Sequence, residues 1–374
     1  MSPGDRRECV DPPSAQAGGA LRDPRLDHDP GVFARALVGI ARALLRLPDA
    51  PPGQIASVLV VRTDDRVGNA LLTVPLVRAL QRALPLARVD LLLAARRAVV
   101  AEGLPGLTVV RFEKTDAFRH PLRFLRSLLA LRRYDVVVDA AHWHAFSLTS
   151  ALLSRWAARR WVVGARRGPP IYSAAVPLPT EGTFEVVAKV ALATALGAPP
   201  GLVPPLETSL GRAAFDAGVA EYVAINPGAR KADHRWPPAQ FGALATALRE
   251  RRGVRSLVVW GPGEEPLARA VVEAAPYAAL LAPPTDLDQL ASILRRAALV
   301  VTNDSGPMHL AVACGAPVVA LFLDTAGLRW AHPGARFAAV LAPADAGPVL
   351  EAALRLLDTA GVPSEPPPSS KETT

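Results

Sequence analysis

Short apolar runs alternate with helix-like segments along this chain, and the alternation occurs twice. The expected strands of the first half lie at 57–61, 88–93, 107–112 and 134–140, and those of the second half at 222–227, 256–261, 298–303 and 317–322. These runs are rich in Val, Leu and Ile, and stretches with helical periodicity lie between them. Short runs without a polar face are typical of a parallel sheet with helices on both sides. The sequence therefore predicts an α/β fold with two such sheets.

The stretch at 196–210 is rich in proline and separates the two halves. Proline disfavours both helix and strand, so a semi-rigid connector is expected here. A chain of 374 residues is long enough for two domains. The predicted organisation is a disordered tail at 1–30, an amphipathic helix within 31–50, an N-terminal domain at 51–203, a C-terminal domain at 204–360 and a disordered tail at 361–374.

Composition excludes several classes of protein. The formal net charge is +8, from 42 Lys and Arg against 34 Asp and Glu, but no stretch combines basic residues with aromatic ones as a single-strand nucleic-acid surface does. Two cysteines, Cys9 and Cys314, lie too far apart to indicate a zinc site or a disulfide framework. No apolar stretch reaches the roughly 18 residues of a membrane span, and no secretory signal is recognisable. A cytoplasmic protein without a nucleic-acid partner is expected.

The segment 32–47 has the periodicity of an amphipathic helix. Arg35, Arg42 and Arg46 fall within an arc of roughly 40° on a helical projection, and the rest of the surface is apolar. Two interpretations stay open. The helix packs on the body of the protein, or it lies on the inner face of the cytoplasmic membrane with the arginines toward anionic lipid.

Ligands of open α/β sheets bind beyond the carboxyl ends of the strands, so residues that follow strands are the informative ones. The first strand is followed by Asp64 and Asp65, and then by Gly68 and Asn69 at the expected start of a helix. A glycine at this point leaves backbone N–H groups accessible to a ligand. Asp65 has a second interpretation, because aspartate is a favourable helix N-cap.

The loop 226–238 follows the first strand of the second half and carries several cations ahead of a helix. Arg230, Lys231, His234 and Arg235 could clamp a diphosphate by charge-assisted hydrogen bonds, or they could belong to an ordinary solvated loop. Glu264 stands after the next strand, where a carboxylate can hold ribose hydroxyls but can equally start a helix.

The most specific segment is 300–311, VVTNDSGPMHLA. A strand ends, an Asp304-Ser305-Gly306 turn follows, and a helix begins at Pro307. The N–H groups of such a turn and the helix dipole attract phosphate, although a purely structural turn would look similar. Neither a GxGxxG nor a Walker A sequence is present.

Two sequences look like a metal-binding Asp-x-Asp motif. Asp27-His28-Asp29 lies in the N-terminal tail. Asp286-Leu287-Asp288 stands just before a helix, which indicates capping and first-turn carboxylates rather than metal ligands. No divalent-metal site is therefore expected.

Four of these segments together resemble glycosyltransferase family 9, the family of the lipopolysaccharide heptosyltransferases. They are VLVVRTDDRVGNALLTVPLVRAL, AINPGARKADHRWPPAQF, GPGEEPLARAV and LVVTNDSGPMHLAVACGAPVVALF, in the family's order, and the resemblance covers roughly 57–358. It implies a GT-B fold, with two Rossmann-like domains facing a central cleft. It also implies a metal-independent, inverting transfer of a heptose-like sugar from an ADP-activated donor to a cell-envelope glycolipid or glycan, with no cofactor besides the nucleotide-sugar.

The resemblance assigns roles to residues of both domains. The donor-binding set would be Asn226, Gly228, Lys231, Arg235, Glu264, Asn303, Asp304, Ser305, Gly306, Pro307, Met308 and His309. The acceptor side would include Gly68, His142 and Trp143. His142 and Trp143 could also be buried, because an apolar environment suits tryptophan equally well.

The sequence departs from the family at the position of the catalytic base. The family has Gly-Asp before its first helix, whereas this chain has Gly68-Asn69, and asparagine is no general base. The loop also has one additional residue, so Asp65 is our first choice for the base and Asp64 the second. His234-Arg235 replaces the family's Lys before Trp-Pro, which arginine can compensate. The alternative hypothesis is a nucleotide-sugar-binding homologue that lost catalysis.

Overall fold

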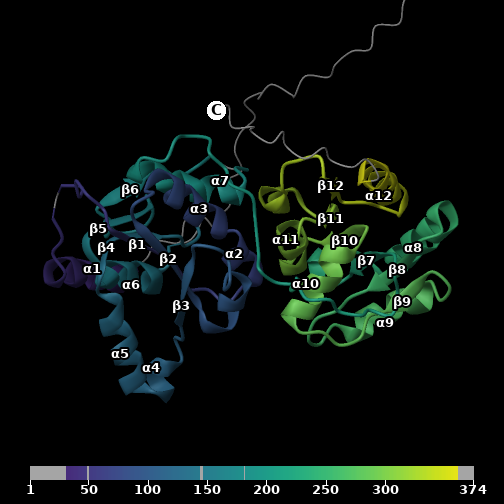
Figure 1. Cartoon of the computed structure of the whole chain (residues 1–374), viewed down its shortest axis with the longest axis horizontal. Coiled ribbons are helices and arrows are strands. Elements are labelled where there is room, and N and C mark those ends of the chain that lie inside the picture. The colour runs from purple at the N-terminus through teal and green to yellow at the C-terminus, as the bar shows by residue number, and fades with distance from the viewer. Residues whose placement is uncertain (1–30, 49, 144–145, 181, 361–374) are drawn as a thin grey trace, which may run out of the picture.

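The computed structural model describes residues 31–48, 50–143, 146–180 and 182–360. Two domains lie side by side, each built on a six-stranded parallel sheet (Figure 1). The α/β fold class predicted from the sequence is thus confirmed. The two expected tails, with Cys9 and Asp27-His28-Asp29, lie outside the described residues.

The N-terminal sheet has the strand order β3-β2-β1-β4-β5-β6. Its strands are β1 (Ser57–Arg62), β2 (Arg88–Ala94), β3 (Thr108–Phe112), β4 (Tyr134–Asp139), β5 (Ala158–Ala165) and β6 (Ala174–Val176). Val58 pairs with Val89 of β2 on one side and with Val136 of β4 on the other. The order reverses at the β1–β4 boundary, which is where a doubly wound sheet forms its ligand crevice.

The C-terminal sheet repeats this order as β12-β11-β10-β7-β8-β9. Its strands are β7 (Tyr222–Asn226), β8 (Arg255–Val258), β9 (Ala279–Leu281), β10 (Leu299–Asn303), β11 (Val318–Phe322) and β12 (Phe337–Leu341). The equivalent boundary lies between β7 and β10, where Leu299 pairs with Val223. Between Leu196 and Tyr222 the chain forms neither helix nor strand, which is the region that contains the proline-rich connector.

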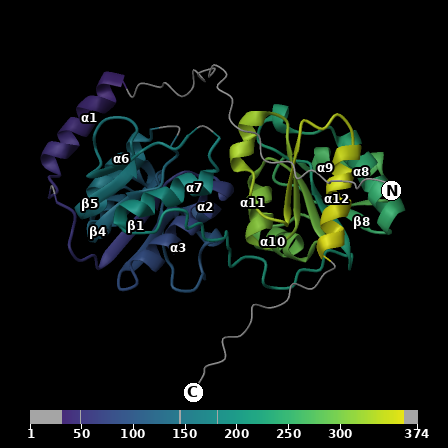
Figure 2. The ribbon, with the colours of Figure 1, turned by 90° about the horizontal axis from the view of Figure 1, so that it is seen from above.

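Helices cover both faces of each sheet (Figure 2). Those of the N-terminal domain are α1 (Gly31–Leu44), α2 (Val67–Leu71), α3 (Val74–Ala83), η2 (Ala95–Val100), α4 (Asp116–Arg119), α5 (Pro121–Leu131), α6 (Leu148–Ala157), α7 (Glu185–Val190) and η3 (Ala191–Leu196). Those of the C-terminal domain are η4 (Ala232–His234), α8 (Pro238–Arg252), α9 (Glu265–Ala274), α10 (Leu287–Arg296), α11 (Gly306–Ala313), η5 (Thr325–Trp330) and α12 (Gly347–Ala360).

The two domains meet where α2 contacts α11. Gly68 is buried at this contact, and a Cβ atom there would lie 2.5 Å from Cδ2 of His309. A continuous apolar cluster extends across the contact and includes Leu71 from α2 and Leu310 from α11. The absence of a side chain at Gly68 therefore allows the two helices to approach closely.

The structure corrects two expectations about the elements. The predicted helix at 68–83 is two helices, α2 and α3, separated near Thr73, whose hydroxyl donates to the Asn69 carbonyl at 2.8 Å. Strands β5, β6, β9 and β12 were not predicted. The residues of β6 and β12 are only partly buried or exposed, and β6 and β9 have three residues each, so these three strands show no long apolar run, whereas β5 contains four successive buried residues and was missed.

Helix α1 packs on the N-terminal domain, which agrees with the interpretation of this segment as a helix packed on the body of the protein. Its buried residues are Ala34 and Val38, and Val38 belongs to a small apolar cluster with Ala151 of α6. Arg35 and Arg42 border a shallow surface cavity with residues 168–170. Contact with lipid stays a proposal for this helix.

Candidate active site between the two domains

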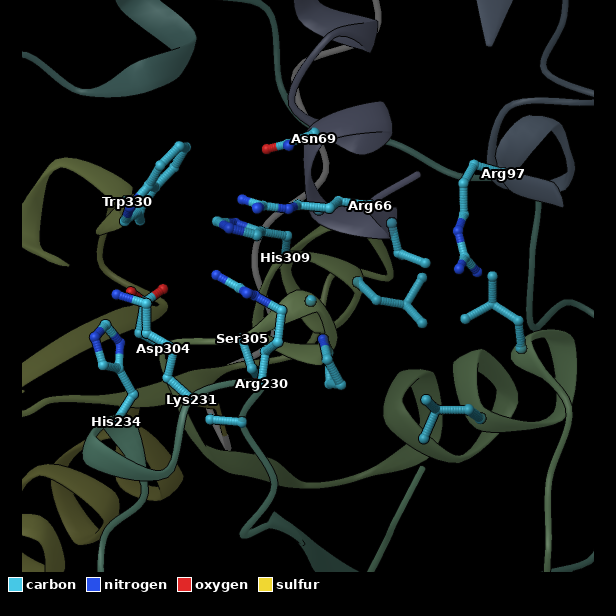
Figure 3. Close-up of a pocket in the computed structure, with 18 of the residues that line it drawn as sticks. Arg66, Asn69, Arg97, Arg230, Lys231, His234, Asp304, Ser305, His309 and Trp330 are labelled. Carbon is cyan, nitrogen blue, oxygen red and sulfur yellow. The ribbon is translucent and has the colours of Figure 1, made fainter. Parts of the chain in front are cut away.

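A cavity of about 430 Å³ lies between the domains, next to the carboxyl ends of β1, β4, β7 and β10 (Figure 3). The N-terminal domain contributes Arg66, Val67, Gly68, Asn69, Arg97 and His142 to its wall. The C-terminal domain contributes Ala229, Arg230, Lys231, His234, Leu287, Leu290, Asp304, Ser305, Gly306, Pro307, His309, Leu310, Arg329 and Trp330. Both crevices predicted by sheet topology thus open into one shared space.

Positive charge dominates the wall of this cavity. Its always-charged side chains are Arg66, Arg97, Arg230, Lys231 and Arg329. Asp304 is the one carboxylate among the lining residues. Guanidinium and ammonium groups gathered from both domains favour a small polyanion, and a diphosphate has the right charge and oxygen geometry.

The first turn of α11 opens into the same cavity. Ser305 is the N-cap residue in extended conformation, and its side chain makes no capping bond to the helix. Ser305, Gly306 and Pro307 all line the cavity. Pro307 has no N–H group and the Met308 N–H donates to the Ser305 carbonyl, so the N–H groups of Ser305 and Gly306 and the positive end of the helix dipole add to the attraction for an anion.

Two buried asparagines position the loops of the donor-side wall. Asn226 donates from Nδ2 to the Thr302 hydroxyl at 3.0 Å and to the Ser305 hydroxyl at 3.1 Å. Asn303 donates to the carbonyl of Pro227 at 2.8 Å and accepts from the backbone N–H of Trp236. Both were predicted as donor-binding residues, and in the structure they support the loops behind the cavity.

Four further predicted donor residues also lie behind the wall. Arg235 donates from Nε to the Ala229 carbonyl at 2.7 Å, and Met308 is buried in the core. Glu264 occupies the N-cap position of α9, as the helix-start interpretation predicted, but its side chain makes no capping bond and accepts from the Gly261 N–H at 3.1 Å. A Cβ atom at Gly228 would overlap the carboxylate of Glu264, so a side chain at this position would displace that carboxylate from its contact with the loop. The predicted residues that reach the cavity itself are Lys231, Asp304, Ser305, Gly306, Pro307 and His309.

The environment of Asp304 makes it an unusual acid. Burial raises its pKa to about 7, the negative charge of Asp324 adds to this rise, and Arg329 opposes it. Near neutral pH this carboxyl group is therefore present in both protonation states. A group with such a pKa can exchange a proton at little cost in free energy.

A buried polar network forms the N-terminal wall behind Asn69. Arg62 is 1% exposed and forms an ion pair with Asp64. It also donates to the carbonyl of Ala140 at 2.5 Å and to Nε2 of His142 at 2.6 Å. Asn69 donates from Nδ2 to Asp64 at 3.1 Å and to Nε2 of His142 at 3.0 Å.

The hydrogen bonds of His142 define its protonation state. Its Nε2 accepts from Arg62 and Asn69, so the proton of the neutral ring lies on Nδ1, which donates to Glu185 at 3.2 Å. Burial, followed by the charge of Arg62, lowers the pKa of His142 to about 3. Burial alone would raise the pKa of Glu185. The ammonium group of Lys189, 2.9 Å away, and the hydrogen bond from His142 lower it by more, so the pKa of Glu185 lies below its ordinary value. His142 is therefore a neutral, oriented imidazole at physiological pH.

Asp64 and Asp65 have opposite surroundings, although they are adjacent in sequence. Asp64 belongs to the network around Arg62. Burial alone would raise the pKa of Asp64, but the positive charge of Arg62 lowers it, and the net effect is a lowered pKa. Asp65 has a side chain that is 58% exposed, and it pairs with Arg97 at 2.8 Å. Asp65 does not line the cavity between the domains. The N-cap position of α2 is Arg66, so the interpretation of Asp65 as a helix cap is wrong.

Trp143, which was predicted on the acceptor side, is buried and does not line the cavity.

A second cavity of about 460 Å³ lies within the N-terminal domain and is bordered by Asp65. The other residues of its wall are Thr63, Ala94, Arg96, Phe112, Glu113, Lys114, Thr115, Asp116, Arg119, His120 and Arg123. Four of them carry a permanent positive charge, against three carboxylates including Asp65. This cavity is therefore a second place where an anionic group can bind.

Several residues of the cavity and its supporting network were not predicted. Arg97, Arg329, Glu185 and Lys189 come from segments that carry no recognisable motif, and Arg66 lies within the first resembling segment but was not singled out there. Only the spacing of Glu185 and Lys189, four residues apart in an otherwise apolar helix, indicates a buried ion pair in retrospect.

Two structural findings concern metals and membranes. Within 31–360, apart from the undescribed positions 49, 144–145 and 181, no group of three or more His, Cys, Asp or Glu side chains is arranged to hold a metal ion. The helices of these same residues are all too short or too polar to cross a bilayer. Asp286 forms a capping box with Gln289 at the start of α10, which confirms the capping interpretation of that Asp-x-Asp sequence.

Comparison with known families decides the assignment. The model of glycosyltransferase family 9 (heptosyltransferase) matches residues 122–355, more than half of the chain. The chain belongs to glycosyltransferase family 9. It is a glycosyltransferase, as the resemblance of its strand-end segments implied. Lipopolysaccharide heptosyltransferase 3 of Escherichia coli is 28% identical over 283 residues, which cover 70% of this chain and 82% of the relative. Lipopolysaccharide heptosyltransferase 1 of E. coli K12 is 26% identical over 296 residues, 72% of this chain and 88% of the relative.

Solved structures of this glycosyltransferase family share the fold. A family 9 glycosyltransferase from Veillonella parvula superposes with a TM-score of 0.71 at 18% identity, covering 83% of this chain and 99% of that one. The E. coli heptosyltransferase WaaC with ADP gives a TM-score of 0.63 at 22% identity, over 81% of this chain and 99% of that one. These likenesses confirm the GT-B architecture.

Proposed function

We propose that this glycosyltransferase transfers a heptose-like sugar from an ADP-activated donor to a hydroxyl group of a cell-envelope glycolipid. The observation that carries the proposal is the cation-lined cavity between the two domains, with the first turn of α11 in its wall. The names of the relatives support this reaction, since they are lipopolysaccharide heptosyltransferases. WaaC, whose fold this chain shares, has been solved with ADP and with ADP-2-deoxy-2-fluoro heptose.

Transfer is proposed to proceed without a metal ion. As the bond between sugar and diphosphate breaks, negative charge grows on the leaving ADP and must be stabilised. Arg230, Lys231 and Arg329 can provide that stabilisation together with the N–H groups at the start of α11. Fixed cations perform the task that a divalent ion performs in metal-dependent transferases.

The acceptor is proposed to approach from the N-terminal domain, which makes the transfer a single displacement with inversion. The acceptor hydroxyl would attack from the side of Asn69 and His142, opposite the donor diphosphate. The second cavity, with Arg96, Arg119 and Arg123, can hold an anionic part of the same acceptor. A glycolipid acceptor would bring the protein into peripheral contact with the cytoplasmic membrane.

Asp64 is the general base in this proposal. Neither carboxylate lines the reaction cavity itself, and each contacts one residue of its wall, Asn69 for Asp64 and Arg97 for Asp65. Asp64 is preferred because it belongs to the buried network with Asn69 and Arg62, whereas the Asp65 side chain is 58% exposed and borders the second cavity. The base takes the proton of the acceptor hydroxyl, directly or through one water, while the oxygen forms a bond to the anomeric carbon. The bonding electrons of the breaking bond leave with ADP.

The test compares Asp64→Asn with the matched variant Asp65→Asn, using ADP-heptose and a lipopolysaccharide-core acceptor. Asp64→Asn is expected to lower turnover by about 10²–10⁴ with ADP affinity unchanged, because it removes basicity and keeps shape. Asp65→Asn is expected to retain turnover close to that of the parent. Equal rates for the parent and Asp64→Asn would exclude Asp64 as the base.

Asn69 favours a second candidate function, a nucleotide-sugar-binding protein that no longer catalyses transfer. The family's carboxylate is absent at this position, while the cation-lined cavity is retained. This candidate predicts tight ADP binding with no transfer from any nucleotide-sugar. The same assay therefore separates the two functions in the parent protein.

A further inference from the structure

Helices α4 and α5 extend from the N-terminal domain away from both sheets (Figure 1). They carry four large apolar side chains that are more than half exposed, at Phe118, Leu122, Leu125 and Leu129. Phe118 is 93% exposed and Leu122 is 72% exposed. Several large apolar groups on adjoining helical turns form a patch, which on a protein surface indicates an interaction site.

Helix α5 has two separate apolar faces. Phe124, Leu128 and Leu131 face inward and pack into the apolar core beneath the helix. At 100° per residue, Leu122, Leu125 and Leu129 fall within an arc of about 60°, whose centre is about 120° away from that of the inward face, and all three are more than half exposed. The inward face accounts for the folding of the helix, so the outward leucines are not needed to attach it to the domain.

Basic residues are frequent in the segment that carries this outward face. Between 113 and 133 the chain has six Lys and Arg residues against two acidic residues, Glu113 and Asp116. Asp116 is buried and pairs with Arg123 at 3.3 Å, and Glu113 accepts hydrogen bonds from Thr115. On the helical projection the exposed side chains of Arg126 and Arg123 follow Leu122 along one side of the apolar stripe. An apolar stripe with arginines beside it complements a surface with acyl chains beneath anionic headgroups.

We propose that α4 and α5 form a docking surface for an anionic lipid bilayer. Phe118 and the three outward leucines enter the boundary between headgroups and acyl chains, and arginines such as Arg126 contact lipid phosphates.

The docking surface adjoins the second cavity, so contact with a bilayer would bring lipid headgroups close to that cavity. Arg119 of α4, Arg123 of α5 and His120 between the two helices line that cavity. A bilayer against the outward leucines would therefore lie next to the space proposed for the anionic part of the acceptor. This link to a glycolipid acceptor rests on the proposed function, whereas the docking itself does not.

The experiment measures flotation of the full chain with phosphatidylcholine vesicles, with and without phosphatidylglycerol. The double variant Leu122→Glu/Leu125→Glu is compared with the matched control Leu86→Glu/Tyr277→Glu, whose two side chains are about 90% exposed elsewhere on the molecule. The parent and the control are expected to bind the anionic vesicles. The Leu122→Glu/Leu125→Glu variant is expected to bind at least about 100-fold more weakly, roughly tenfold for each leucine withdrawn from the bilayer. Arg126→Gln is expected to weaken binding about fivefold.

Vesicle binding by the leucine double variant equal to that of the parent overturns the proposal. So does a concentration-dependent dimer of the parent that this variant abolishes while neither protein binds vesicles, because the patch then contacts a second copy. Calorimetric titration with ADP is run on the same proteins and is expected to be unaffected by the double variant, which also shows that it is folded. Absence of ADP binding in a parent that still binds vesicles would contradict the proposed function and leave the docking surface standing.

Discussion

Replacing Asp304 by Asn is expected to change how stability depends on pH. The ordinary pKa of an aspartate is 3.8, and burial beside Asp324 raises that of Asp304 to about 7. Between these two values the folded protein retains a proton that the unfolded chain has released. Stability of the parent therefore falls as pH rises through this window, since the unfolded state binds fewer protons.

The size of the effect follows from the difference between the two pKa values. About three pH units at 1.36 kcal/mol each give about 4 kcal/mol as the upper limit. The advantage of the protonated carboxyl group is complete below the ordinary pKa of 3.8 and is lost above about 7. Asparagine does not ionise, so relative to the parent Asp304→Asn gains up to about 4 kcal/mol between about pH 4 and about pH 8.

Urea unfolding at a series of pH values measures this gain directly. Other titrating groups at the cavity, including His234 and His309, are present in both proteins, so they largely cancel in the difference between parent and variant. Two stability curves that run parallel from acid to alkaline pH would refute the reasoning. The same pair should differ in ADP binding, because ionised Asp304 repels the diphosphate. Affinity is expected to fall more steeply in the parent than in Asp304→Asn as pH rises through 7.

Two further predictions follow from the packing. Gly68→Ala places a Cβ atom 2.5 Å from His309, so it should separate α2 from α11, cost about 1–3 kcal/mol of stability and lower turnover. Gly306→Ala is the matched control, since its nearest neighbour would be 3.8 Å away, and unchanged melting of both variants would contradict the argument. If helix α1 also touches lipid, changing Arg35, Arg42 and Arg46 together to Glu should weaken binding to anionic vesicles by about fivefold per arginine. Unchanged vesicle binding by this triple variant would show that α1 is only packed on α6.

The sequence was most informative where burial is complete. Central strands such as β1 and β10 are apolar on both faces, because helices cover the sheet on each side, and such runs are visible in a single sequence. Edge strands lack this signal. Strand β12 pairs with β11 on one side only and has no fully buried residue, so its pattern resembles that of a loop.

The cavity itself was predictable only in part. The rule that ligands bind beyond strand ends located Asn69, Lys231 and Asp304, because each follows a strand that the sequence reveals. Arg97 and Arg329 reach the cavity from short helices far away in the chain, and their positions depend on tertiary packing. The choice between Asp64 and Asp65 as the base stays a prediction, and the sequence leaves it open for a local reason. Adjacent residues beyond a strand point to different sides, and one residue of loop length decides which carboxylate faces the network.

Charge balance gives a physical reason for asparagine at position 69. The network behind the cavity holds two cations, Arg62 and Lys189, and two carboxylates, Asp64 and Glu185. His142 stays neutral between them, so the charges of these four side chains cancel. A carboxylate at 69 would stand about 3 Å from Asp64, where two like charges cannot both ionise without a large cost in free energy. The Asn69 amide instead donates to both neighbours, which leaves Asp64 ionised and able to accept a proton.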